Sequence, residues 1–205
     1  MEPASRSPEP RWVQLLSSPT LIISAILVVV YIIVGIAAGS LLDPIQPVPL
    51  VYLLMQCDNP TPIFPWTIIT AIFLHANILH IASNLVFLLF FGFVLEEQVS
   101  KSQWIMTFFV TGLVGSISFV GYDSAAFVLT GFPNPSPLDC AVGASGAVYG
   151  IMGTAVGLKI VILLIFLLGL NIFAGGGTPA HLGGLVAGLV LRNYWSLGDR
   201  PFRGI

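Results

Sequence analysis

The chain has 205 residues, of which 56% are hydrophobic and only 8% are charged. Soluble domains carry about 25% charged residues because their surfaces face water, so this composition excludes an ordinary soluble domain. The net charge of -2 gives no reason to expect a nucleic-acid partner. We expect one membrane domain over residues 19–195, embedded in a lipid bilayer, with short tails at 1–18 and 196–205.

Apolar runs of about 20 residues can cross a bilayer as helices, and the first such run covers residues 21–38. This run is too long to be the apolar part of a cleavable signal peptide. A loop rich in proline follows it, because proline at such density interrupts a helix. Further spans are expected at 66–95, 103–122, 143–158, 160–173 and 179–194, with a polar loop at 123–142. The sequence therefore predicts an all-α membrane protein with six transmembrane helices.

The basic residues orient these six spans. Six of the seven fall in the two tails, the loop between spans two and three, or the loop between spans four and five, and Arg192 lies at the end of the sixth span beside the C-terminal tail. The seven are Arg6, Arg11, Lys101, Lys159, Arg192, Arg200 and Arg203. Because cytoplasmic loops carry an excess of Lys and Arg, both termini are expected in the cytoplasm. The chain is expected to be a multi-pass protein of the plasma or inner membrane.

The two cysteines, Cys57 and Cys140, fall in loops that this orientation places outside the cell. Two cysteines are too few for a disulfide framework or a zinc site. A single bridge can form in an oxidising compartment, but two unpaired thiols are the favoured interpretation.

Polar groups inside the spans indicate function, because ionisable side chains are costly in a membrane. The chain has three histidines, His75, His80 and His181, and all lie in or at the mouth of predicted spans. Spans two, four and six are expected to run from outside to inside, so His80, Ser145 and His181 can meet near the outer surface. His75 lies about 140° around the helix from His80, and a structural role is assigned to it.

Glycines follow both Ser145 and His181 at helical spacing. Small residues at such spacing let helix backbones approach closely in lipid. Generic helix packing is the simpler explanation, but these glycines lie on or beside the face of the serine and on the face of the histidine. They are Gly146, Gly150, Gly153 and Gly157 in the fourth span, and Gly184 and Gly188 in the sixth.

This arrangement predicts nucleophilic catalysis. A serine hydroxyl becomes a strong nucleophile when a base takes its proton, and histidine is the usual base. Ser145 lies at a predicted helix start, where unpaired backbone N–H groups can stabilise a negative oxygen. Asn84 lies four residues after His80, so both side chains share one helix face and can donate hydrogen bonds.

Other classes of membrane protein fit less well. Gly143-Ala-Ser145-Gly146 is not the nucleophile elbow of soluble hydrolases, since Ala follows it and no strand precedes it. There is no His-Glu-x-x-His pair and no acidic second shell for zinc, so neither a metal nor a cofactor is expected. The spans contain no Asp pair for an aspartyl protease. They also lack the buried charge or repeated broken helices of a channel or carrier.

Together the motifs resemble the rhomboid family of intramembrane serine proteases, over about residues 65–191. They are Trp66-Thr67, His75-x4-His80-x3-Asn84, Phe91-Gly92-x2-Leu95-Glu96, Gly143-Ala-Ser145-Gly146-x2-Tyr149 and Ala180-His181-x2-Gly184-x3-Gly188. The serine motif alone is weak, but together the motifs are highly specific in their order and their placement on the spans. The resemblance implies a six-helix rhomboid-like bundle that cleaves single-span membrane proteins near the outer end of their helix.

The resemblance also implies the roles of individual residues. Ser145 would be the nucleophile and His181 the general base and acid. The oxyanion hole would consist of His80, Asn84 and the Ser145 N–H. Supporting roles would fall to Gly143, Gly146, Tyr149, Gly184 and Gly188, with Tyr149 stacked on the His181 ring. Because the dyad lies in one chain, a monomer is expected to suffice, and the sequence does not indicate the oligomeric state.

Two features depart from the family pattern. The loop after the first span lacks the Trp-Arg pair that many members carry. Only the 35 residues 146–180 separate Ser145 from His181, so the fifth span is expected to be short or tilted. The alternative function is a catalytically inactive rhomboid-like protein that binds or escorts membrane proteins. Inactive relatives usually lose the serine or the histidine, whereas this chain keeps both.

Overall fold

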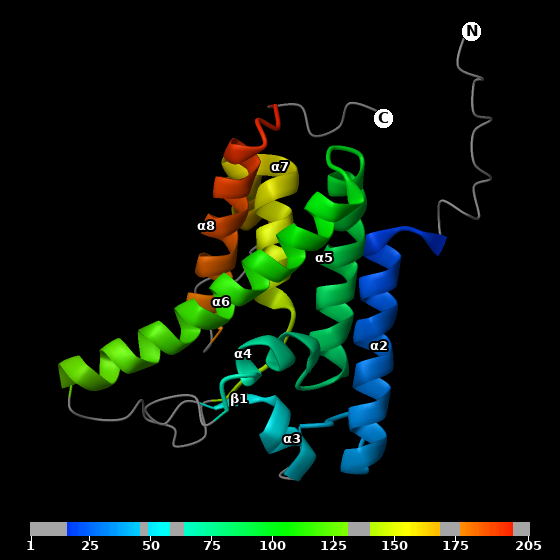
Figure 1. Cartoon of the computed structure of the whole chain (residues 1–205), viewed down its shortest axis with the longest axis vertical. Helices are drawn as coiled ribbons and strands as arrows, with labels where there is room; N and C mark the ends of the chain where they lie inside the picture. Colours follow the sequence, from blue (N-terminus) through cyan, green and yellow to red (C-terminus); the bar gives the residue numbers. More distant parts are fainter. Residues whose placement is uncertain (1–15, 46–48, 58–63, 131–139, 169–176, 199–205) are drawn as a thin grey trace, which may run out of the picture.

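The computed structural model describes residues 16–45, 49–57, 64–130, 140–168 and 177–198. In these parts the chain is mainly helical, and its long helices form one bundle (Figure 1). The long helices are α2 (Pro19–Ala38), α5 (Ile78–Glu96), α6 (Lys101–Thr130), α7 (Ser145–Leu168) and α8 (Thr178–Tyr194). The short elements are α3 (Pro49–Leu54), β1 (Gln56–Cys57), α4 (Thr67–Thr70), η1 (Ala71–Phe73) and β2 (Cys140–Ala141).

Four helices of the described residues are long and apolar enough to cross a membrane. Two of them are α2 and α5, and the others are Lys101–Tyr122 of α6 and Ser145–Ile162 of α7. The helix α8 is shorter, with 17 residues. Large apolar side chains on the bundle surface, such as Val29 and Ile33 of α2, are more than half exposed. An apolar surface of this extent is costly in water and suited to lipid.

The helix α7 lies at the centre of the bundle and packs against α5, α6 and α8. The helices α5, α7 and α8 run in one direction and α2 runs in the opposite direction (Figure 1). Glu96 joins α5 to α2, because its carboxylate accepts hydrogen bonds from the Ser18 hydroxyl (2.7 Å) and the Thr20 N–H (2.8 Å). A negative charge at a helix N-terminus is favourable, so this contact fixes the start of α2.

The bounds predicted for two of the spans agree closely with helices of the structure. The first, predicted over 21–38, is α2, which begins after the N-cap Ser18 and ends at the left-handed Gly39. The sixth, predicted over 179–194, is α8.

The predicted second span, 66–95, is wrong as a single helix. The chain forms α4 and η1, then becomes extended at Leu74, and α5 starts only after Asn77. The Asn77 side chain accepts a hydrogen bond from the His80 N–H at 2.9 Å. Asn is a favoured N-cap residue, and it starts a new helix within an apolar run.

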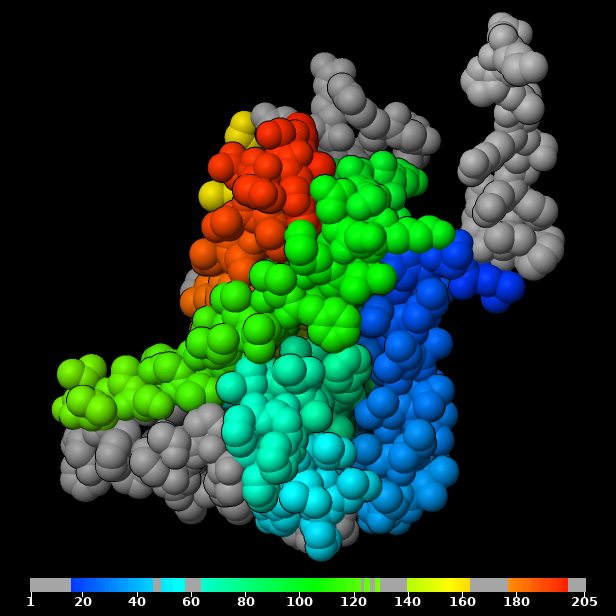
Figure 2. Space-filling model, viewed as in Figure 1, coloured from blue at the N-terminus to red at the C-terminus, as the bar shows by residue number. Residues whose placement is uncertain are grey.

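The helix that contains the third span begins earlier and ends later than the predicted range 103–122, although the apolar span itself ends at Tyr122. Ser100 and Gln103 form a capping box, in which Ser100 Oγ accepts from the Gln103 N–H and Gln103 Oε1 accepts from the Ser100 N–H. This places the helix start at Lys101. The helix continues to Thr130, so the loop predicted over 123–142 is wrong for residues 123–130. Figure 2 shows this C-terminal part of α6 projecting beyond the other helices.

The predicted boundary between the fourth and fifth spans corresponds to a break inside α7. Gly157 is non-helical, with φ 73° and ψ 171°. The carbonyls before a helix break lack their usual N–H partners. Arg192 of α8 supplies them, since its Nη1 donates to the carbonyls of Thr154 (2.7 Å) and Ala155 (3.0 Å). The helix resumes and runs to Leu168, while residues 169–173 of the predicted fifth span lie outside the described residues.

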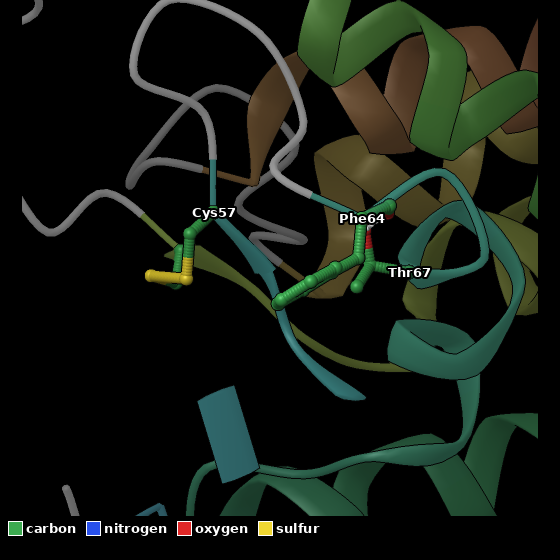
Figure 3. The surroundings of a disulfide bond; sticks show 4 residues. Cys57, Phe64 and Thr67 are labelled. Carbon is green, nitrogen blue, oxygen red and sulfur yellow. Dashed lines mark hydrogen bonds between the residues drawn. A yellow bond between two sulfur atoms is a disulfide. The ribbon is translucent and has the colours of Figure 1, made fainter. Parts of the chain in front are cut away.

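The interpretation of the two cysteines as unpaired thiols is wrong. Cys57 and Cys140 form a disulfide (Figure 3). The strands β1 and β2 that carry them pair antiparallel, with Cys57 opposite Cys140 and Gln56 opposite Ala141. This pairing brings the loop after α2 next to the segment that leads into α7.

Candidate active site

Ser145 and His181 lie side by side at the N-terminal ends of α7 and α8. A hydrogen bond of 2.9 Å joins Ser145 Oγ to His181 Nε2. Tyr149, one turn along α7, stacks on the His181 ring with centroids 4.6 Å apart and an angle of 28° between planes. The other ring nitrogen, Nδ1, is buried and has no hydrogen-bond partner among the described residues. The stacked tyrosine therefore holds the orientation of the imidazole. In a catalytic triad, a carboxylate hydrogen-bonded to Nδ1 has this role.

Glycines on both helices allow this contact. An added Cβ at Gly184 would lie 2.0 Å from the Gly146 carbonyl oxygen, and one at Gly188 would lie 2.1 Å from the Gly150 carbonyl oxygen. Real Cβ atoms do not approach a backbone oxygen so closely, so α7 and α8 are in direct backbone contact. The glycine spacing in the sequence thus corresponds to the face on which the serine and the histidine meet.

His80 and Asn84 of α5 lie next to this pair. The Ala76 N–H donates to His80 Nδ1 at 3.4 Å, which leaves the proton of a neutral imidazole on Nε2 as a donor. Asn84 is 5% exposed, and its Nδ2 donates to the His80 carbonyl at 2.9 Å. A second Nδ2 hydrogen remains for another acceptor. Two side-chain donors therefore accompany the backbone N–H of Ser145.

Gly143 must be glycine for two reasons. Its φ is +126°, a conformation that residues with a side chain rarely adopt, and an added Cβ would lie 2.7 Å from His80 Cε1. Its N–H donates to the Ala71 carbonyl at 2.9 Å. The chain therefore passes directly over the His80 ring before it enters α7 at Ser145.

His75 does not join this group. Its ring is 1% exposed and meets the His80 ring edge-on, with centroids 5.2 Å apart. It lines neither of the two cavities that border Ser145. Its position in the break before α5 agrees with a structural role.

Two cavities meet at Ser145, and His80 and His181 line both of them. The larger has a volume of about 770 Å³ and the smaller about 170 Å³. The smaller is walled by Asn84, Phe87, Val148, Tyr149 and Met152, among others. The larger cavity also borders Gln56, Ser116, Phe119 and residues 140–143. Apart from Gly143, the sequence interpretation missed this second group, because Gln56 lies in a proline-rich loop and gave no signal.

The geometry is suited to acyl transfer at Ser145. A base within hydrogen-bond distance can take the hydroxyl proton, and the α5 donors His80 and Asn84 line the smaller cavity together with Ser145 and His181. Among the described residues, no three His, Cys, Asp or Glu side chains come together as metal ligands.

Comparison with known proteins agrees with this geometry. A rhomboid domain family model matches residues 64–196, which is well over half of the chain. Rhomboid-like protease 3 of Toxoplasma gondii is 30% identical over 149 residues, or 64% of this chain and 52% of the relative. RHOMBOID-like protein 6, mitochondrial, of Arabidopsis thaliana is 33% identical over 143 residues, or 62% and 42%.

A bacterial relative gives a similar match. Rhomboid protease GluP of Bacillus subtilis is 27% identical over 138 residues, or 60% of this chain and 24% of the relative. The chain thus aligns with about half or less of the length of these relatives. The predicted resemblance is confirmed, and with its apolar helices the chain is a multi-pass membrane protein that belongs to the rhomboid family.

Proposed function

We propose that the chain is an intramembrane serine endopeptidase that cleaves transmembrane segments of other membrane proteins. The observation that carries this proposal is the hydrogen bond of 2.9 Å between Ser145 Oγ and His181 Nε2. Serine and imidazole placed in this way within a bilayer have a clear chemical use, whereas polar groups without one are costly there.

The reaction follows from the positions of the atoms. His181 Nε2 takes the Ser145 hydroxyl proton while Oγ attacks the carbonyl carbon of the substrate. The His80 Nε2–H, an Asn84 Nδ2–H and the Ser145 N–H stabilise the resulting oxyanion. His181 then gives its proton to the leaving amine as the C–N bond breaks. A water molecule, deprotonated by His181, hydrolyses the acyl-enzyme and regenerates Ser145.

The form of the site favours a locally unwound substrate. In an intact helix the peptide carbonyls are hydrogen-bonded and shielded by side chains, so a nucleophile cannot reach them. Cleavage is therefore expected near the end of a single-span helix, at a point where small or helix-breaking residues expose the backbone. One chain supplies the whole dyad, so a monomer suffices for activity.

The topology we propose has six spans with both termini in the cytoplasm. The fifth span would comprise the part of α7 after Gly157 together with the residues that follow it, and α8 would be the sixth. The Cys57–Cys140 disulfide supports this orientation, because disulfides persist in oxidising compartments and are rare in the cytosol. It lies close in sequence to Ser145, so the site would open toward the outer face of the plasma or inner membrane.

A fluorophosphonate probe tests the proposal directly. In liposomes we expect the wild-type protein to be labelled and to cleave a single-span reporter, while Ser145→Ala does neither. The probe reacts only with an activated serine, so labelling reports on the dyad without any knowledge of the substrate. Equal labelling of the wild type and of Ser145→Ala would overturn the enzyme proposal. It would favour the alternative of an inactive rhomboid-like binding or escort protein.

Asn84→Ala is expected to weaken cleavage without abolishing it. Removing one oxyanion donor costs about 100-fold to 1,000-fold in soluble enzymes. Here the His80 and Ser145 donors remain, so we expect kcat to fall about 100-fold. The matched control is Val86→Ala on the same helix, because Val86 is 64% exposed and points away from the site. A rise in KM with kcat unchanged, or an equal fall in kcat in the control, would contradict an oxyanion role for Asn84.

A further inference from the structure

The segment that leads into the nucleophile is covalently tied to a distant part of the chain. Cys140 in β2 lies shortly before Ser145, and its disulfide partner Cys57 in β1 belongs to the loop after α2. The sequence separation of the two cysteines is 83 residues. Figure 3 shows the bond between the two paired strands. A bond at this place constrains the chain just before it enters the active site.

The tie is anchored at its far end. Gln56, next to Cys57, is 1% exposed, and its Nε2 donates to the Ser116 carbonyl of α6 at 3.2 Å. The strand β1 is therefore fixed to a membrane helix, and the disulfide transmits that fixed position to β2. At the near end the Gly143 N–H bonds to the Ala71 carbonyl. Residues 140–143 are thus held from two sides.

These held residues form one wall of the larger cavity, with Ser145 and His181 on another side. The dyad itself has separate support. Ala144 and Ala147 are fully buried, and α7 contacts α8 through backbone atoms at Gly146. Loss of the disulfide would therefore increase the mobility of residues 140–143 more than it would disturb the serine and the histidine.

We propose that the Cys57–Cys140 disulfide is a positioning element for substrate binding. It fixes residues 140–143 in the place where they receive the unwound substrate segment, and it takes no part in the bond-breaking steps. This inference rests on the proposed protease function.

The test compares the oxidised wild type with the same protein reduced by dithiothreitol and with Cys57→Ser/Cys140→Ser, all in liposomes. For a single-span reporter we expect KM to rise about tenfold, since a mobile wall must be ordered each time substrate binds. We expect kcat to stay within about twofold, because binding that is equal in the ground and transition states changes KM alone. The rate of fluorophosphonate labelling at Ser145 should be unchanged.

Three controls separate positioning from simple loss of structure. Cys57→Ser and Cys140→Ser should each match the double variant, because either change removes the same bond. Dithiothreitol should have no effect on the double variant. Reoxidation of the reduced wild type with oxidised glutathione should restore its KM. If the serine variants do not fold, the reduced wild type still provides the measurement.

The inference is overturned if reduction leaves KM unchanged, or if labelling and kcat fall in parallel with kcat/KM. If the oxidised wild type neither labels nor cleaves, the protease function itself has failed. A different result is an oxidised enzyme that is active and whose KM does not change on reduction. That result would contradict the positioning role alone.

Discussion

His181→Ala is expected to abolish cleavage of a single-span reporter while the helices remain folded. In the part of the chain that the structure describes, His181 Nε2 is the base at Ser145 Oγ, at 2.9 Å, so its loss removes the acceptor of the hydroxyl proton. Loss of the base in soluble serine hydrolases costs about 10⁴-fold or more in kcat. The measurement is kcat in liposomes, together with fluorophosphonate labelling, which should also disappear.

The control for this variant is Leu182→Ala, the next residue on α8, whose side chain is partly exposed and outside both cavities. Residues that act as one unit have non-additive effects. The double variant Ser145→Ala/His181→Ala should therefore be no slower than either single variant. A thermal unfolding curve close to that of the wild type is required for His181→Ala. A shared loss of folding and activity would instead indicate that the histidine is a packing residue.

Gly184→Ala is expected to impair both stability and activity. The added methyl would lie 2.0 Å from the Gly146 carbonyl oxygen, so α7 and α8 must move apart. Overpacking of this kind costs about 1–3 kcal/mol. Because the dyad spans these two helices, a separation of about 1 Å would also lower kcat by about 100-fold. The measurements are the midpoint of thermal unfolding in detergent and kcat in liposomes.

Gly121→Ala on α6 provides the matched control, since an added Cβ there meets no atom within 4 Å. In a helix this change should be neutral or slightly stabilising, because alanine has the higher helix propensity. Wild-type kcat in Gly184→Ala would show that the dyad tolerates separation of the helices. It would argue against the close approach of α7 and α8 as the basis of the site.

The sequence predicted that Ser145 and His181 would meet, because their meeting depends on short-range patterns. Gly184 and Gly188 repeat with the period of a helix face, and so do Gly146 and Gly150, so their contact could be inferred before any coordinates. Ser145 and His181 followed, because Ser145 lies beside the glycine face of its helix and His181 lies on the glycine face of its own. The short separation between them, which suggested a tight geometry, is compatible with the observed contact.

The remaining parts depended on information that an apolar pattern does not contain. Asn77 lies inside a run that hydropathy treats as one span, and only its capping bond to the His80 N–H shows that a new helix starts there. The early start of α6 could have been found from Ser100 and Gln103, which form a known capping pattern. The disulfide could not, since a separation of 83 residues gives no indication of proximity. Gln56 was missed for the same reason.

The break at Gly157 divides α7 into two helical segments. In an uninterrupted helix, a tilt of the C-terminal half would also move the N-terminal end, where the nucleophile lies. Here the helix is interrupted at Gly157. The guanidinium of Arg192, on α8, donates hydrogen bonds to carbonyls of the part of α7 that precedes the break. The part of α7 after Gly157 is therefore not joined to Ser145 by one continuous helix, whereas the part that carries Ser145 is held to α8, the helix that carries its base.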